Sequence, residues 1–322
     1  MAGGGSCTQI GANTVSEHPR PLLLDVDTGV DDAVAITLAS RLERHKLVAL
    51  TTVAGNVPIE YSTDSTLRVV DWLGLDVPVY RGMSRPLVAP LATAREHHGY
   101  TGLGSWTPPE AHSRIERATA PEAIVQTVRA NEGNIALAFV GPLTNLAVAL
   151  ALEPRLPEMV SKLVIMGGAF FSRGNMTDLA EFNIYVDPEA AALVARAGFD
   201  ALWVGLDATR QTQLTADDWK ALADADEPAE VLVREVMRRS FEEVGRSGFP
   251  LHDPLAVALV EEPEIATTRR GAVRVSLEHG SRGETRVGAV AVPDVEHGVA
   301  DQVNVQRFFR LFGKVCPRLT KD

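Results

Sequence analysis

Residues 22–32, with the sequence LLLDVDTGVDD, join an apolar run to four carboxylates in the last eight positions. The apolar run at 22–26 is typical of a buried β-strand, and Thr and Gly at 28–29 are typical of a turn. Residues 31–39 then predict an amphipathic helix whose first two residues, both Asp, lie at its positive N-terminal end. The stretch therefore predicts a strand–turn–helix unit of an α/β fold, with acids where the strand ends.

The four acids, Asp25, Asp27, Asp31 and Asp32, would repel one another and their pKa values would rise unless a cation neutralised them. Carboxylate oxygens are hard ligands that suit calcium or magnesium better than zinc or copper. The stretch thus predicts a divalent-cation site at the mouth of the sheet. Two alternatives stay open, acids that only cap a helix and a metal-dependent phosphatase. The phosphatase alternative rests on the likeness of Asp25-x-Asp27 to the haloacid dehalogenase-type nucleophile motif. That motif has Thr or Val two positions after its second Asp, where this chain has Gly29 instead.

The chain of 322 residues carries 31 Lys plus Arg against 42 Asp plus Glu, a net charge of −11. Phosphate backbones and anionic lipids need positive surfaces, so we expect neither a nucleic-acid polymer nor a membrane as a partner. The two cysteines, Cys7 and Cys316, form no disulfide framework, which favours a reduced, cytoplasmic setting. No apolar run approaches the ~20 residues that span a bilayer. Residues 1–20 lack the apolar core of a signal peptide and predict a flexible tail.

Apolar strands alternate with helical segments along most of the chain. Strands are expected at 47–53, 77–80, 135–140, 163–166 and 202–206, and helices at 59–73, 121–131, 146–152, 188–197, 215–247, 255–260 and 302–312. Two late strands, 273–277 and 286–292, predict a small antiparallel addition. Long irregular segments at 85–119 and 169–183 are unusual unless they serve a function. We therefore predict an α/β fold with an open, mostly parallel sheet and helices on both faces, in a single domain over residues 21–315.

Polar or glycine residues follow several predicted strands at the point where each strand ends. Asp27, Asn56, Asn145 and the Gly pair at 167–168 all take this position. The carboxyl ends of parallel strands meet at one edge of a sheet, which is where such folds bind their ligands. The shared position favours a binding site over solvated helix caps.

Residues 25–32 resemble the signature of the inosine–uridine-preferring nucleoside hydrolase family, Asp-x-Asp-x-Gly-x-Asp-Asp. Further matching motifs follow in the family's order: VAGN at 53–56, GPLTN at 141–145, MGG at 166–168, GN at 174–175, EFN at 181–183 and HDP at 252–254. The resemblance covers residues 20–310. One short motif would be weak, whereas all of them in order are a specific signal.

The resemblance implies an enzyme that cleaves the N-glycosidic bond of ribonucleosides with water, in nucleoside catabolism or purine and pyrimidine salvage. It implies one Ca²⁺ held by Asp27, Asp32, the backbone carbonyl of Val140 and Asp253. Asp27 would also be the general base toward water, and His252 the general acid toward the leaving base. Substrate contacts are implied for Asp31, Asn56, Asn175, Glu181 and Asn183 on the ribose, and for His98, the other candidate acid, in a loop over the base. A homodimer or homotetramer is also implied.

The residue types agree with parts of this assignment. Glu181 and Asn183 are two apart, so in an extended segment both would face the same side. A histidine with an ordinary pKa near ~6.5 donates a proton at neutral pH, which suits His252 beside Asp253. A base pocket is expected from Tyr100, Phe170, Phe241, Glu242 and Arg246. An alternative from a different functional class is a non-catalytic protein that keeps the calcium pocket and binds nucleoside or ribose.

Overall fold

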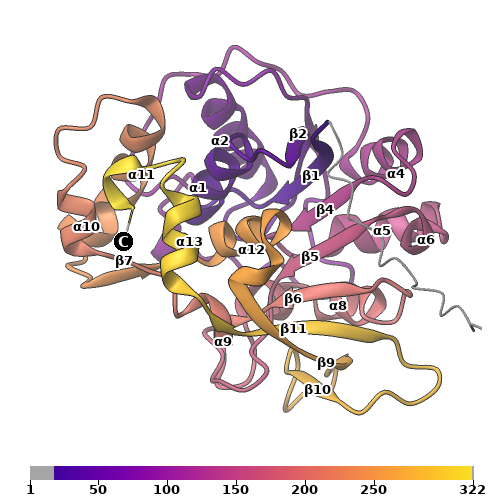
Figure 1. Ribbon diagram of the computed structural model, residues 1–322. Coiled ribbons are helices and arrows are strands. Elements are labelled where there is room, and N and C mark those ends of the chain that lie inside the picture. Colours follow the sequence, from indigo (N-terminus) through magenta and orange to yellow (C-terminus); the bar gives the residue numbers. More distant parts are fainter. Residues whose placement is uncertain (1–17, 321–322) are drawn as a thin grey trace, which may run out of the picture.

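The computed structural model describes residues 18–320, so the predicted tail at 1–20 lies almost wholly outside the described residues. Within them, a nine-stranded sheet has the order β10-β9-β11-β6-β5-β4-β1-β2-β3 (Figure 1). Its strands are β1 (Arg20–Val26), β2 (His45–Thr52), β3 (Val79–Arg81), β4 (Ala136–Phe139), β5 (Lys162–Met166), β6 (Ala201–Val204), β9 (Ala266–Val275), β10 (Thr285–Gly288) and β11 (Glu296–Val303).

The seven strands in the order β11-β6-β5-β4-β1-β2-β3 run parallel to their neighbours. Strand β9 is antiparallel to both β11 and β10. A separate antiparallel pair joins β7 (Gln213–Thr215) to β8 (Gly248–Pro250). The predicted open, mostly parallel sheet with a small antiparallel addition is therefore confirmed.

The central strands send alternate side chains into two cores on opposite faces of the sheet. In β1, Leu22 and Leu24 lie in one core and Leu23 in the other, all fully buried. The first face is covered by α1 (Val30–Ala39), α2 (Ile59–Trp72), α11 (Pro228–Arg238), α12 (His252–Glu261) and α13 (Val305–Phe312). The other face is covered by α4 (Ala120–Ala130), α5 (Thr144–Leu152), α6 (Leu156–Met159) and α8 (Pro188–Val194) (Figure 1). Helices on both faces are thus confirmed.

Helix α1 is buried on every side, and the prediction of an amphipathic helix is wrong. All ten of its residues are buried, because α11 and α12 cover the side that a single helical layer would leave to water. Asp31 and Asp32, in its first turn, consequently lie in the interior of the protein.

The last third of the chain departs most from the expected elements. Strand β11 lies where no strand was predicted, and α13 begins at Val305 rather than at residue 302. The predicted helical region 215–247 comprises α10 (Ala216–Lys220), α11 and a π-helical turn, Arg239–Glu243. The short helices α3 (Arg95–His98), α7 (Phe182–Val186) and α9 (Leu206–Thr209) and the 3-10 turns Pro263–Ile265 and Pro317–Leu319 lie in connections. No helix between residues 18 and 320 is long and apolar enough to cross a membrane.

Candidate active site

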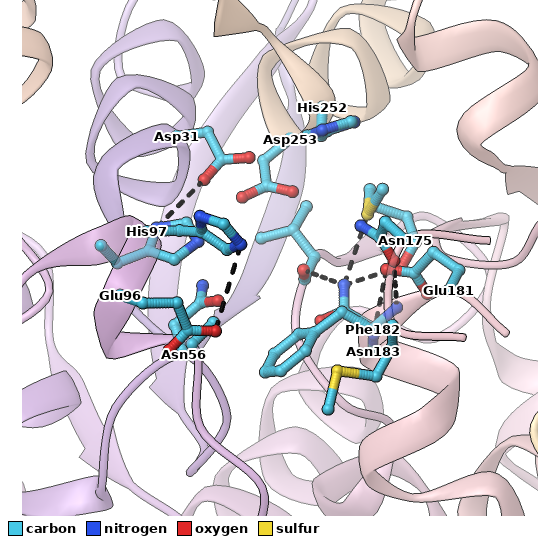
Figure 2. A pocket seen from close by; sticks show the side chains of 15 residues that line it. Asp31, Asn56, Glu96, His97, Asn175, Glu181, Phe182, Asn183, His252 and Asp253 are labelled. Atoms are coloured by element: carbon cyan, nitrogen blue, oxygen red, sulfur yellow. Dashed lines mark hydrogen bonds and ion pairs between the residues drawn. The ribbon is translucent and has the colours of Figure 1, made fainter. Parts of the chain in front are cut away.

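The segments that follow β1, β2, β4 and β5 converge on one cavity of about 140 Å³ (Figure 2). The predicted residues that line it are Asp31, Asn56, His98, Val140, Asn175, Glu181, Asn183, His252 and Asp253. Asp31 and Asn56 face Asn175 and Glu181 across the opening, and Asp253 and His252 enter from the start of α12. Asp27 and Asp32 lie beneath this lining and are fully buried.

Three carboxylates form a buried cluster beside the cavity. One oxygen from each of Asp31, Asp32 and Asp253 lies within 4.8 Å of the others. Asp27 adjoins them, and its backbone N–H donates to Asp32 Oδ1 at 3.0 Å. The Val140 carbonyl, which accepts from Asn183 Nδ2 at 2.7 Å, also faces the cavity. The cluster therefore includes Asp31, which the predicted ligand set does not.

This cluster has the electrostatic character of a cation site. Burial, followed by repulsion from Asp32, raises the pKa of Asp27 well above its usual range and that of Asp31 to about 8. Burial and the neighbouring carboxylates raise the pKa of Asp253 as well. Among the described residues, Asp27 Oδ1 and Asp31 Oδ1 are buried without a hydrogen-bond partner. Like charges with unpaired oxygens in a dry site fit a divalent cation with oxygen ligands.

Two glycines of the sequence motifs make room for the Asp27 carboxylate. A Cβ on Gly55 would lie 2.1 Å from Asp27 Oδ2, and one on Gly141 would lie 2.9 Å from Asp27 Oδ1. The Asn56 backbone N–H donates to Asp27 Oδ2 at 2.6 Å. The glycines after β2 and β4 therefore allow the backbone to approach Asp27 closely and fix its carboxylate.

Asp25 and Asn145 lie under the site and do not line the cavity. Asp25 Oδ2 accepts hydrogen bonds from Thr51 Oγ1 at 2.5 Å and from Asn145 Nδ2 at 2.7 Å. Burial raises the pKa of Asp25 to about 7 despite these bonds. The two residues tie β1 and β2 to α5, so Asp25 is a structural residue and not an exposed nucleophile for phosphoryl transfer.

Glu181 and Asn183 reach the cavity by a different geometry from the predicted extended segment. Glu181 is the N-cap of α7, and its carboxylate accepts from the backbone N–H groups of Asn183 at 2.9 Å and Ile184 at 3.1 Å. The extended-chain reasoning is wrong, because the capped turn itself brings both side chains to the pocket. Asn175 Oδ1 accepts from the Phe182 N–H at 2.9 Å, which joins the preceding loop to this turn.

The two predicted pocket histidines, His98 and His252, are held by hydrogen bonds at Nδ1. His98 Nδ1 accepts from the Val30 backbone N–H at 3.1 Å, and His252 Nδ1 lies 2.7 Å from Thr209 Oγ1. Burial, followed by nearby positive groups, lowers the pKa of His98 to about 3. Burial, together with Arg210 and Arg246, lowers that of His252 to about 4. The structure thus places the pKa of His252 below the ordinary value expected from the sequence.

A second cavity of about 250 Å³ adjoins the first and shares with it Asp31, His97, His98, Asn175 and His252. Its other lining residues are Leu206, Arg210, Arg246, Phe249 and Pro250. Of the expected base-pocket residues, Arg246 alone lines it. Tyr100 contacts Tyr61 and Arg95, Phe170 packs on Trp203, Phe241 stacks on Trp219, and Glu242 borders another groove.

Several lining residues were not predicted from the sequence, namely Glu96, His97, Met176, Phe182, Arg210 and Phe249. His97 had a signal, because it stands next to the predicted His98. Arg210 and Phe249 had none, since short elements outside the family motifs, α9 and β8, bring them to the cavity.

The parallel sheet, the buried acids and the polar cavity at its carboxyl edge define an α/β enzyme with an acidic cluster that could hold a metal ion. The chain matches the inosine-uridine preferring nucleoside hydrolase family over residues 22–310 and belongs to that family. It is 36% identical over 265 residues to the pyrimidine-specific ribonucleoside hydrolase RihB of Escherichia coli (strain SE11), covering 81% of this chain and 84% of RihB.

Solved structures agree with the family assignment. A purine-preferring ribonucleoside hydrolase from Gardnerella vaginalis has a TM-score of 0.87 and 32% identity, covering 94% of this chain and 98% of that one. A plant nucleoside hydrolase, the PpNRh1 enzyme, has a TM-score of 0.87 and 30% identity, covering 95% and 100%. The resemblance seen in the sequence is confirmed, and the protein is a nucleoside hydrolase.

Proposed function

We propose that the protein hydrolyses ribonucleosides to ribose and free base with a bound Ca²⁺. The observation that carries this is the buried carboxylate cluster with unpaired oxygens beside a polar cavity. Asp27, Asp32, the Val140 carbonyl and Asp253 would hold the ion, with Asp31 beside them. When bound, Ca²⁺ supplies the positive charge that neutralises these acids and lowers the pKa of a bound water.

Asp27 acts as the general base. Its Oδ2 is held by the Asn56 N–H, and its Oδ1 has no hydrogen-bond partner among residues 18–320 and is free to take a proton. The water oxygen bonds to the anomeric carbon as its proton passes to Asp27. Positive charge develops on the sugar ring as the glycosidic bond breaks, and the surrounding carboxylates stabilise it.

The remaining lining residues orient the substrate. Ribose hydroxyls are held by Asp31, Asn56, Asn175, Glu181 and Asn183, which surround the first cavity. His98 and His252 line both cavities, so they border the position of the scissile bond. His252 assists the departing base, and His98 contacts it. The base occupies the second cavity.

The relatives differ in base preference, since one is named pyrimidine-specific and another purine-preferring. We propose a small nucleoside as the partner, with neither a nucleic-acid polymer nor a membrane. We also propose a homodimer or homotetramer, whose mass light scattering would measure. The cytoplasmic setting and the role in salvage or catabolism likewise stay predictions.

The test is release of reducing sugar from inosine, adenosine, guanosine, uridine, cytidine and nicotinamide riboside, with the free base identified by chromatography. We expect equimolar ribose and base from at least one nucleoside, and the rates rank the bases. Saturable nucleoside binding without any product would instead indicate the non-catalytic binding protein. Phosphate release from phosphate esters would indicate the phosphatase.

A further inference from the structure

Helix α9 places a buried hydroxyl against His252. Thr209 is fully buried, and its Oγ1 lies 2.7 Å from His252 Nδ1. Within residues 18–320, no other hydrogen bond is formed by this hydroxyl or by the His252 ring. His252 lines both cavities, so with Nδ1 engaged by Thr209 its Nε2 is the ring nitrogen left for a ligand.

The direction of this hydrogen bond follows from what each group can do. If His252 donated from Nδ1, the Thr209 hydroxyl hydrogen would be buried with no acceptor, which is unfavourable. If Thr209 donates instead, that hydrogen is satisfied and Nδ1 carries no proton. An imidazolium has a proton on both nitrogens, so a ring that accepts at Nδ1 is neutral with its proton on Nε2.

His98 shows the same arrangement without ambiguity. Its Nδ1 accepts from the backbone N–H of Val30 at 3.1 Å, and a backbone N–H only donates. The neutral His98 ring therefore also keeps its proton on Nε2. Of the three histidines that border both cavities, His98 and His252 are therefore held alike.

We propose that Thr209 is a positioning residue: its buried hydroxyl donates to His252 Nδ1, so that the ring proton of His252 lies on Nε2, from which it is donated in a hydrogen bond to the departing base. The proposal rests on the proposed nucleoside hydrolysis and refines the role given there to His252. Neutral histidine is an established electrophile when its tautomer is fixed.

His252 keeps its Nε2 proton throughout the reaction. The electron pair of the broken C–N bond remains on the base nitrogen, where the negative charge is stabilised by the Nε2–H of His252. The water oxygen bonds to the anomeric carbon and one water proton passes to Asp27. The base then takes a proton from solvent, and Asp27 returns its proton to solvent, which gives ribose and neutral base.

The tautomer is measured directly by nitrogen NMR of the full chain labelled with ¹⁵N-histidine. Spectra of His252→Gln and His98→Gln assign the two rings. We expect an unprotonated Nδ1 and a protonated Nε2 for His252 in the wild type and in Thr209→Ser, and a mixture of tautomers in Thr209→Val. A wild-type His252 with a protonated Nδ1, or with both nitrogens protonated at neutral pH, overturns the proposal whatever the activity.

Kinetics distinguish positioning from a general structural role. Thr209→Val keeps the shape but removes the hydroxyl, and we expect it to lower kcat on nucleosides by roughly 10- to 100-fold. Its rate on p-nitrophenyl riboside should stay near that of the wild type, because nitrophenolate departs without a donor. Thr209→Ser keeps the hydroxyl and should retain nucleoside turnover close to that of the wild type. Equal losses on both substrates, or no loss on nucleosides, contradict the proposal.

The two proposals fail in different ways. A wild-type protein that releases no ribose from any nucleoside refutes the proposed function, and the NMR measurement still decides the His252 tautomer. A wild-type protein that releases ribose while its Nδ1 is protonated refutes the role of Thr209 alone.

Discussion

Asp27 is the residue on which the proposed chemistry depends most. Its carboxylate adjoins the acidic cluster, is fully buried and has one oxygen without a partner among the described residues. We expect Asp27→Ala to lower kcat by about 10²- to 10⁴-fold, the usual contribution of a general base. Asp217→Ala is the matched control, because this acid lies on α10 with its side chain 91% exposed. Full turnover by Asp27→Ala with calcium bound would refute the assignment.

Gly55 supports Asp27 through the absence of a side chain. A Cβ at this position would lie 2.1 Å from Asp27 Oδ2, so Gly55→Ala should displace the carboxylate. We expect most of the activity to be lost while thermal unfolding shows the protein still folded. Gly280→Ala is the control, since a Cβ there meets nothing within 4 Å. Wild-type kcat in Gly55→Ala would show that Asp27 tolerates the shift.

Site residues close together in the sequence could be predicted, whereas their protonation could not. The DxDxGxDD spacing fixes Asp27, Asp31 and Asp32 at the end of one strand, whatever the rest of the fold does. The pKa of His252 instead depends on burial and on Arg210 and Arg246, which distant segments bring to the ring. An isolated motif carries no information about those neighbours.

At the scale of elements, α9 holds the loop that delivers Asn175. The Asp207 carboxylate accepts from the Phe170 and Phe171 N–H groups, both at 2.8 Å. Arg210, directly after α9, donates to the carbonyl of Arg173 at 2.7 Å and to that of Gly174 at 3.2 Å. One helical turn therefore fixes both ends of residues 170–174.

Removing the Arg210 contacts should weaken ribose binding more than the chemical step. Arg210→Gln loses the hydrogen bonds that the guanidinium donates to Ser172, Arg173 and Gly174, in a loop whose position sets Asn175. We expect a KM for the best nucleoside raised about tenfold or more, with a smaller change in kcat. Arg155→Gln, whose side chain is 66% exposed, is the control. An unchanged KM would show that the loop keeps its position without Arg210.

Glu261 fastens the end of α12 to the start of β2. Its carboxylate accepts from the backbone N–H groups of Glu43 at 3.1 Å and Arg44 at 2.8 Å, and it contacts His45 Nδ1 at 2.8 Å. Burial alone would raise its pKa, but these hydrogen bonds outweigh burial and lower the pKa below its ordinary 4.5.

The lowered pKa of Glu261 predicts a pH-dependent contribution to stability. A carboxyl with a depressed folded-state pKa stabilises the fold above its unfolded pKa, and that contribution is lost as pH falls through the folded value. Glu261→Gln should lower the free energy of unfolding by about 1–3 kcal/mol at neutral pH. The difference should shrink below pH 4.5. Glu264→Gln, with a side chain 64% exposed, is the control. A pH-independent difference in urea unfolding would contradict this account.

Elements with a strong apolar pattern could be predicted, and those defined by their neighbours could not. Strands β1, β4 and β5 lie near their predicted ranges because both their faces are buried. Strand β11 was missed because it contains His, Asp and Gln, and pairing with β6 and β9 defines it. Helix α7 was missed because Glu181 caps a single turn inside a long loop.

Across the whole molecule, the nine-stranded sheet separates two cores, and the site lies at the carboxyl edge of its parallel strands. Unpaired carboxylates in such a site oppose folding unless an ion satisfies them. The ion should therefore stabilise the protein as well as support turnover, by roughly 2.7 kcal/mol at a hundredfold excess over its Kd. Calorimetric unfolding with and without calcium measures this gain, and an unchanged transition would contradict a resident ion.

The central claim is that turnover depends on calcium held by this acidic cluster. The most direct measurement is ribose release by the protein as purified, after chelation to a metal-free state verified by elemental analysis, and after adding back Ca²⁺ or Mg²⁺. We expect activity to be lost on chelation and restored by Ca²⁺ in the wild type but not in Asp253→Ala. Undiminished ribose release by the verified metal-free protein would contradict the account.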